Sequence, residues 1–410
     1  MTEVVSIGTY LPPWISGGGK KQRRVKGPDE DALTMAVAAG RAADPQAAAQ
    51  RVVFVTRNFP LVEGGNAAVL LAALGLPADT PVTEVLGGAP AVLDQLVAAA
   101  PGTLVIGADD NDQAVGAAAA LTGAGGLPIG AVARQSRSLP LVARRDDGSR
   151  HDYPDPRLQR EVGVGATLAR LGLNGGAKVA AVVGAPAKQV GKGRDTSSAV
   201  EEPVSSAAGP IRALAQAIEH RVSGLVFAIE QATVSVAALA EPTAAVRIAR
   251  DEVSPRDLPA VQIAPGNGIP ISMPAYSRAF ESKIRWEAAV FDERPGIDSA
   301  PQFPPRTRVS DTGELARDYR LEPLPRTGTV YTHTTIRIPV PDLPSPYTLA
   351  VVQLDDSPVR VLMKVTGVPA GETQIGQPGT VVLRRIAERS GVPDYGYAFW
   401  PGRTQEGVPA

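Results

Sequence analysis

The stretch Thr83-Glu84-Val85-Leu86-Gly87-Gly88-Ala89-Pro90-Ala91-Val92-Leu93 decides how this chain of 410 residues folds. It follows a segment punctuated by Gly and Pro, and it runs into apolar residues spaced as on one face of a helix. We interpret it as the end of a strand or loop that turns into a buried helix, with the two glycines at the bend.

The segments around this turn predict an α/β fold. Asp29, Glu30 and Asp31 are expected in the first turn of a helix, where negative charge suits the helix dipole. The apolar runs 52–56 and 103–108 are typical of strands buried on both faces, and 67–74 suits a short helix. A similar order returns in the second half, with strands expected at 178–183 and 224–229 and an amphipathic helix at 208–220. Strands and helices at this spacing indicate a mostly parallel sheet covered by helices, built as a weak internal repeat.

The C-terminal part has a different pattern. Prolines and charges dominate 245–325, which we interpret as a structured linker. From residue 328 onward, four or five strands with short turns predict a small all-β barrel.

Composition excludes several classes of function. Lys and Arg number 41 against 42 Asp and Glu, which gives no field for nucleic acid or an anionic membrane. The absence of cysteine excludes disulfides, thiolate nucleophiles and cysteine-bound zinc, and three histidines make a His-rich metal site improbable, so we expect no metal cofactor. No apolar run is long enough to cross a bilayer and the N-terminus lacks the features of a signal peptide, so we expect a cytoplasmic protein.

The turn at 83–93, the motif Gly27-Pro28-Asp29-Glu30-Asp31 before an expected helix and the tetrapeptide Ile106-Gly107-Ala108-Asp109 together resemble the thiolase superfamily. The similarity is greatest to its hydroxymethylglutaryl-CoA synthase and ketoacyl synthase III branch. This resemblance implies a five-layered αβαβα domain over 1–290, and it implies a dimer, either homodimer or heterodimer.

The motif Gly328-Thr329-Val330-Tyr331-Thr332, the turn 375–379 and the aromatic end 395–401 resemble the OB-fold domain of the DUF35 family, over 328–402. A zinc ribbon usually precedes such domains. Here 291–327 is expected to be a linker with a cysteine-free remnant of that ribbon, so its zinc site must be lost.

The resemblance also implies what has been lost from the active site. The nucleophilic cysteine of the family falls on Gly87, and its acid/base histidine falls on Gly184. Its asparagine falls near Glu202, and its Gly-rich loop falls on 229–233, which includes Glu230. Claisen condensation through a thioester-linked enzyme is therefore not expected, and Gly87 and Gly184 mark the old substrate pocket.

Three side chains are candidates for replacement chemistry. Glu202 and Glu230 would act as a carboxylate pair for general acid and base work, and Tyr153 would donate to an oxyanion. The alternatives are that the acids are exposed or bound to an arginine that fills the dead pocket, and that Tyr153 only caps a turn. The basic residues Lys20, Lys21 and Arg24 follow three glycines and would meet the phosphates of coenzyme A, or would form a solvated surface loop.

Two functions follow. The first is an enzyme of secondary metabolism that binds an acyl-CoA or an acyl carrier protein, coenzyme A being part of the substrate. It would run carbon–carbon bond or cyclisation chemistry without a covalent intermediate. The second is an inactive thiolase-like subunit that partners an active condensing enzyme. Nucleic-acid binding by the barrel is disfavoured because its strands lack a basic, aromatic face.

Overall fold

The computed structural model describes residues 1–19, 22–61, 65–111, 113–136, 142–144, 149–152, 155–173, 175–268, 281–389 and 391–403. The chain forms two compact units, each assembled from several stretches. Unit 1 contains Met1–Leu11, Ala38–Phe59 and Thr80–Glu252; unit 2 contains Pro12–Val37, Pro60–Asp79 and Val253–Ala410. The sequence predicts a first domain over 1–290, whereas the stretch from Val253 onward groups with the C-terminal part.

One sheet of eleven strands runs through unit 1, in the order β12-β11-β13-β14-β8-β1-β7-β6-β4-β5, with β15 paired to β1. Its strands are β1 (Thr2–Leu11), β4 (Arg51–Thr56), β5 (Val82–Leu86), β6 (Thr103–Asp110), β7 (Val115–Thr122), β8 (Leu127–Gln135), β11 (Val179–Val183), β12 (Val200–Glu202), β13 (Gly224–Glu230), β14 (Thr233–Leu239) and β15 (Arg247–Glu252). The runs predicted as buried strands are β4, β6, β11 and β13.

The sheet consists of two halves with the same topology. In the N-half, β5, β4 and β6 are parallel and β7 is antiparallel to β6; in the C-half, β12, β11 and β13 are parallel and β14 is antiparallel to β13. The two halves join where Thr2–Val4 of β1 pair with Leu127–Ile129 of β8. The predicted internal repeat is thus present in the strand order.

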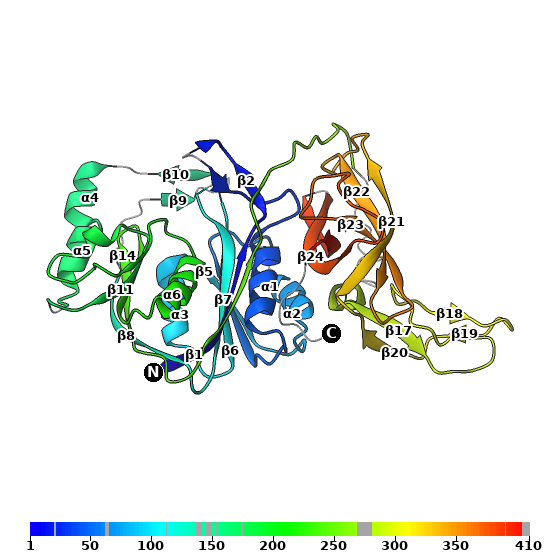
Figure 1. Cartoon of the computed structure of the whole chain (residues 1–410), viewed down its shortest axis with the longest axis horizontal. Helices are drawn as coiled ribbons and strands as arrows, with labels where there is room; N and C mark the ends of the chain where they lie inside the picture. The colour runs from blue at the N-terminus through cyan, green and yellow to red at the C-terminus, as the bar shows by residue number, and fades with distance from the viewer. Residues whose placement is uncertain are drawn as a thin grey trace. The chain divides into compact units, whose positions relative to one another are not determined.

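Helices form layers inside and outside the two halves of the sheet. The helices are α1 (Ala32–Ala43), α2 (Asn66–Leu74), α3 (Ala89–Val97), α4 (Pro156–Val162), α5 (Val164–Arg170) and α6 (Gly209–Glu219), with a 3-10 helix at Ala187–Gln189. Figure 1 shows α3 and α6 between the two halves, with α4 and α5 outside the C-half. The end of α1 packs on β1, so the predicted five-layered α/β class is confirmed.

Small residues let these layers approach closely. A Cβ at Gly8 of β1 would lie 2.3 Å from the carbonyl oxygen of Ala39 in α1, and one at Gly107 of β6 would lie 2.1 Å from that of Ala207, just before α6. The layers therefore pack backbone against backbone at these two points, which explains why an Ala-rich chain with few aromatics builds a dense core.

The acidic motif before α1 has a different place from the one predicted. The sequence predicts Asp29, Glu30 and Asp31 in the first turn, but the helix begins at Ala32 and its first turn contains no acid. Asp31 caps the helix instead: Thr34 N donates to Asp31 Oδ1 and Asp31 N donates to Thr34 Oγ1, both over 2.9 Å. Glu30 Oε2 accepts from Gly27 N at 2.7 Å, so the motif shapes its own turn.

Unit 2 contains a closed barrel in the order β21-β22-β23-β25-β24. Its strands are β21 (Thr327–Ile336), β22 (Tyr347–Leu354), β23 (Arg360–Val365), β24 (Pro378–Arg389) and β25 (Val392–Pro401). A parallel contact between β23 and β25 closes the barrel, while its other pairs are antiparallel. The barrel predicted from residue 328 onward is confirmed.

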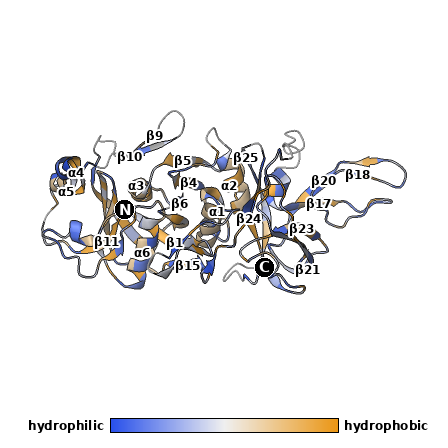
Figure 2. Cartoon of the chain, turned by 90° about the horizontal axis from the view of Figure 1, so that it is seen from above, coloured by the Kyte–Doolittle hydropathy of each residue, from blue (hydrophilic) through white to orange (hydrophobic). Residues whose placement is uncertain are grey.

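Short strands complete the two units. They are β2 (Trp14–Ser16), β3 (Arg23–Arg24), β9 (Val142–Arg144), β10 (Arg150–Asp152), β16 (Arg256–Asp257), β17 (Glu287–Phe291), β18 (Arg308–Val309), β19 (Leu315–Ala316) and β20 (Tyr319–Pro323). β17 pairs with β20 and β18 with β19, which makes the arm next to the barrel in Figure 2. Much of the predicted linker 291–327 therefore lies in this β-arm, whose small core contains Phe291, Ile297 and Ala316.

A buried cation ties the barrel to the acidic motif within unit 2. Arg384 of β24 is 1% exposed, and its guanidinium lies 3.4 Å from Glu30 and 3.9 Å from Asp29. Tyr395 of β25 donates its hydroxyl hydrogen to Asp31 Oδ2 at 2.7 Å. The acids of the motif thus neutralise a charge inside the unit and hold the barrel wall.

We predict that Gly107→Ala destabilises the protein by about 1–3 kcal/mol, because the new methyl group overlaps the Ala207 carbonyl. The matched control is Gly165→Ala, at an exposed glycine of α5 where a Cβ meets nothing within 4 Å. It should be neutral or stabilising, since alanine favours helix. Urea unfolding of both variants measures the difference, and equal midpoints would contradict the close packing.

Candidate functional site

The glycine turn connects β5 to α3, as the sequence predicts. Gly87 N donates to the carbonyl oxygen of Thr56, the last residue of β4, at 3.0 Å, and Gly88 is the N-cap of α3. A Cβ at Gly87 would lie 2.6 Å from the Cβ of Ala91. A side chain at Gly87 would therefore collide with Ala91 unless the turn shifted.

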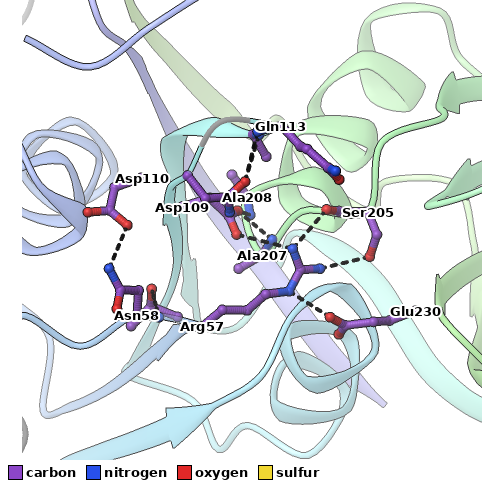
Figure 3. A network of polar contacts seen from close by, with 12 residues as sticks. Arg57, Asn58, Asp109, Asp110, Gln113, Ser205, Ala207, Ala208 and Glu230 are labelled. Atoms are coloured by element: carbon purple, nitrogen blue, oxygen red, sulfur yellow. Dashed lines mark hydrogen bonds and ion pairs between the residues drawn. The ribbon is translucent and has the colours of Figure 1, made fainter. Parts of the chain in front are cut away.

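Arg57, the residue after β4, occupies the space beside this turn (Figure 3). Its Nη1 donates to Ser205 O at 3.1 Å and its Nη2 donates to Ser205 Oγ at 2.9 Å. Its Nε lies 2.6 Å from Glu230 Oε1 without a linear hydrogen bond, so that contact is mainly electrostatic. The side chains of Arg57 and Glu230 keep 23% and 26% of their surface exposed, so a ligand in solution can reach the pair.

Asp109, near the end of β6, lies under the guanidinium. Its Oδ2 accepts from Ala207 N at 2.6 Å and from Ala208 N at 3.2 Å, which satisfies the start of α6. Its Oδ1 is buried, has no hydrogen-bond partner and lies 3.8 Å from Arg57 Nη1. Burial raises the pKa of this carboxyl to about 6, although Arg57 and the two amides oppose the rise.

The second glycine of the turn makes room for the ion pair. A Cβ at Gly88 would lie 2.4 Å from both Arg57 Nη2 and Glu230 Oε2. The pair of Arg57 and Glu230 therefore covers the N-terminus of α3, where the backbone amides favour negative charge. We call the four residues Arg57, Asp109, Ser205 and Glu230 the elbow cluster.

Glu202 has another partner. It ends β12, and its Oε1 lies 3.6 Å from Arg212 Nε and accepts from Gln216 Nε2 at 3.4 Å, both on α6. Glu202 and Glu230 are thus each paired with an arginine. This is the alternative that the sequence left open for both acids, namely that they are bound to an arginine. Their joint action as an acid/base pair stays a prediction.

Gly184 and Arg57 occupy matching positions in the two halves of the sheet. Thr56 pairs with Leu86 in the N-half as Val183 pairs with Glu202 in the C-half, and the next residue along the inner strand is Arg57 or Gly184. Gly184 has a φ of +87°, and a Cβ there would lie 1.9 Å from Ile229 O. Only glycine is tolerated at this point, so Gly184 supplies backbone rather than chemistry.

The remaining predicted site residues are not assembled at the elbow cluster. Tyr153, Lys20 and Lys21 lie outside the described residues. Arg24 lies in the hairpin of β2 and β3, and its guanidinium donates to Pro12 O at 2.7 Å and to Val253 O at 2.8 Å. These bonds give Arg24 a structural role within unit 2, and phosphate binding by it stays a prediction.

Sequence reasoning missed Arg57 and Asp109 as site residues. Asp109 belongs to the tetrapeptide 106–109 that carried the family resemblance, so a signal was present for it. Arg57 directly follows a buried strand, which is where parallel sheets place functional residues. Its contact with Ser205, 148 positions away, has no local signature.

The described residues contain neither a metal-binding cluster nor a helix that could span a membrane. No group of three or more His, Asp or Glu side chains there is placed to hold a metal ion. None of the helices described is both long and apolar enough to span a membrane.

A family model for the C-terminal OB-fold domain of ChsH2 matches residues 321–384, which cover β21 to β23 and the start of β24. This segment is therefore similar to the C-terminal OB-fold domain of ChsH2. The closed five-stranded barrel agrees with that assignment, so the predicted resemblance of the C-terminal part is confirmed. The OB-fold domain belongs wholly to unit 2.

No curated protein matches the sequence of this chain. Among solved structures, similarity is found to 3-oxoacyl-[acyl-carrier-protein] synthase III from Aquifex aeolicus, at 15% identity over 59% of this chain and 100% of the other, with a TM-score of 0.46. The C143A variant of OleA from Xanthomonas campestris gives 15% identity over 58% and 96%, with a TM-score of 0.46.

The Ltp2-ChsH2(DUF35) aldolase gives 19% identity over 31% of this chain and 94% of the other, with a TM-score of 0.25. At identities and TM-scores this low, none of these similarities assigns an activity. The assignment of the OB-fold domain depends on the family model, and that of the layered fold of unit 1 depends on the observed strand order.

We predict a pH signature of Asp109. Its pKa of about 6 in the folded protein exceeds its ordinary 3.8, so between these values the folded state binds a proton that the unfolded chain has released. The contribution of Asp109 to the free energy of unfolding therefore falls as pH rises from about 4 to about 6, by up to about 3 kcal/mol.

Asp109→Asn removes this titration and keeps an oxygen for the two amides. The unfolding free energy of the wild type minus that of the variant should fall between pH 4 and 6.5 and level off above. Chemical denaturation at several pH values measures it. A difference that stays constant or rises over this window would contradict the burial of a titrating carboxyl.

Proposed function

We propose that this protein is a thiolase-like enzyme that acts on an acyl thioester of coenzyme A or of a carrier protein, without a covalent acyl-enzyme. The observation that carries the proposal is the elbow cluster. Arg57, Asp109 and Glu230 come from the ends of three strands and meet at the N-termini of α3 and α6. In open α/β sheets the carboxyl ends of strands are where ligands bind.

The cluster contains the groups that acid/base chemistry on a carbonyl compound needs. A guanidinium stabilises an oxyanion or enolate, and Arg57 reaches solvent through a quarter-exposed side chain. Burial raises the pKa of Asp109 to about 6, and one of its oxygens has no hydrogen-bond partner, so it can take and return a proton. This supports carbon–carbon bond or cyclisation chemistry of the general acid/base kind.

In this proposal the substrate displaces the carboxylate of Glu230 from Arg57. Its carboxylate holds Arg57 over the N-terminus of α3, and an anionic or polarised carbonyl oxygen of the substrate would replace it there. Glu202, Tyr153 and the basic residues Lys20, Lys21 and Arg24 remain proposed contacts, with the phosphates of coenzyme A as the partner of the last three.

The test is a titration of the purified protein with coenzyme A and a panel of acyl-CoAs, followed by calorimetry and thermal shift. We expect saturable binding that raises the melting temperature, and slow loss of at least one acyl-CoA by mass spectrometry. Arg57→Met should weaken binding at least tenfold. Arg134→Met removes an arginine from an exposed pair with Asp94 and should leave binding unchanged.

Absence of binding by every member of the panel would overturn the acyl-CoA form of the proposal. Equal binding by Arg57→Met and the wild type would show that the elbow cluster is not part of the binding site. Binding without turnover would favour the second candidate function.

That second candidate is a subunit that pairs with another thiolase-like chain. The specific observation is β5, the last strand of the sheet, whose outer edge pairs with no strand among the described residues and which ends in Leu86 with 71% of its surface exposed. A free strand edge beside an exposed leucine is a surface suited to pairing with a second copy of the same fold.

We predict that the purified chain is a dimer by light scattering and that Leu86→Arg shifts it toward monomer. Val309→Arg is the matched control, because Val309 in β18 is an apolar residue with 65% exposure on another surface. A monomeric wild type, or a dimer that both substitutions leave intact, would contradict pairing through β5.

A further inference from the structure

Unit 2 contains a cavity of about 480 Å³ beside the OB-fold barrel. Its walls are β22, β23 and β24 on one side and the segments around Trp14, Pro28 and 259–263 on the other. These walls all belong to unit 2. A volume of this size is in the range of small-molecule sites in proteins. We call it the barrel cavity; no residue of the elbow cluster lines it.

The barrel cavity has an apolar interior, and its mouth exposes apolar residues. Trp14, Val365 and Ile386 line its interior. Val261 and Ile263 also line it, with 38% and 59% of their surface exposed. Apolar side chains that stay open to water around an apolar cavity indicate a site for the hydrophobic part of a ligand.

Five charged side chains also line the barrel cavity, namely Asp29, Asp342, Lys364, Arg385 and Glu388. Three of them are acids and two are bases, so the lining has one carboxylate more than it has cations. Because a site prefers the ligand whose charge complements its own, the sign of this surplus decides which ligand charge the cavity favours.

Both cations of the lining already have a carboxylate that acts on them. Arg385 Nη1 lies 3.5 Å from Glu388 Oε2. Burial lowers the pKa of Lys364, and the negative charge of Asp29 opposes that fall. Lys364 Nζ also donates to the carbonyl oxygen of Ile386 at 2.6 Å. Neither cation therefore needs an anion from the ligand.

Asp29 has one further cation near it, the buried Arg384 of β24, at 3.9 Å. That guanidinium has a second and closer acid in Glu30, which is itself buried and lies 3.4 Å away. The two acids Asp29 and Glu30 thus balance the two cations Arg384 and Lys364. This group of four is neutral without a ligand.

Asp342 is the acid of the lining that this balance leaves over. It lies in the tight turn that the bridge between Val340 and Leu343 closes, before β22, with a φ of +62°. In the described part of the chain, no lysine, arginine or histidine nitrogen lies within 4.0 Å of its carboxylate. A Cβ at Gly268 would lie 1.3 Å from Asp342 Oδ2, so the carboxylate lies against bare backbone.

We propose that the barrel cavity binds an apolar molecule that carries one ammonium group, with the ammonium on Asp342 and the apolar part against Trp14 and Ile386. The ammonium forms a charge-assisted hydrogen bond with the carboxylate, and the hydrocarbon part removes apolar wall from water. The ligand class is an amphipathic primary amine. The inference does not depend on the proposed acyl-thioester chemistry, because the elbow cluster belongs to unit 1.

The test is calorimetry of the full chain at pH 7 with octylamine as the probe, since an alkyl amine is protonated at this pH. The uncharged counterpart is 1-octanol and the anionic one is octanoate. We expect saturable binding of octylamine that is at least tenfold tighter than that of octanol, and octanoate should bind more weakly than octanol.

Asp342→Asn keeps the size of the side chain and a residue that tolerates positive φ, but removes the charge. It should lower the affinity for octylamine to that for octanol. The matched control is Asp356→Asn, at an exposed aspartate that also has a positive φ, +52°, and does not line the barrel cavity. It should leave all three affinities unchanged.

Three results would overturn the proposal: no binding of octylamine, octanol or octanoate bound as tightly as octylamine by the wild type, or an unchanged preference in Asp342→Asn. Melting curves establish whether each variant folds. The comparison of the three probes uses only the wild type, so it decides the proposal even if Asp342→Asn is unstable.

Discussion

The layered fold of unit 1 depends on the contact of bare backbone between β6 and the segment before α6. Gly107 lets the carbonyl of Ala207 approach to a distance that a methyl group would forbid. This contact fixes the height of α6 over the sheet, and with it the amides of Ala207 and Ala208 above Asp109. The same approach buries the carboxyl, which is why its pKa is raised. The contact between Gly107 and Ala207 therefore determines both the packing of α6 on the sheet and the raised pKa of Asp109.

Local sequence patterns predicted those parts of the fold that are determined locally. Continuous apolar runs indicated β4, β6, β11 and β13, because strands covered on both faces need no polar side. The glycine turn and α3 followed from two glycines before a helical apolar face, and alternation indicated the barrel strands. Within 291–327, predicted as a linker with a cysteine-free ribbon remnant, the strands β18, β19 and β20 belong to the β-arm, and the pairing of β17 with β20 across a long, Pro-rich insertion has no local signature.

The candidate site was less accessible to such patterns. Glu230 was singled out by position, but its partner Arg57 lies in the other half of the sheet, 173 residues earlier, and no periodicity connects them. Matching positions in the repeat, Arg57 and Gly184, became visible only through strand register. The acids at 29–31 suggested a helix dipole, whereas their actual partners, Arg384 and Tyr395, lie at the far end of the sequence.

That last arrangement has a consequence for how the chain is made. Asp31 and Tyr395 are 364 positions apart, and both are buried where they meet. At ribosomal speeds of about 5–20 residues per second, roughly 20–70 s pass between the synthesis of the acid and that of its phenol partner. During that time Arg384 and Tyr395, which pair with Glu30 and Asp31 in the folded protein, have not yet been synthesised. Unit 2 can therefore complete its fold only after β25 has been translated. By then all strands of unit 1, the last of which ends at Glu252, have already been synthesised.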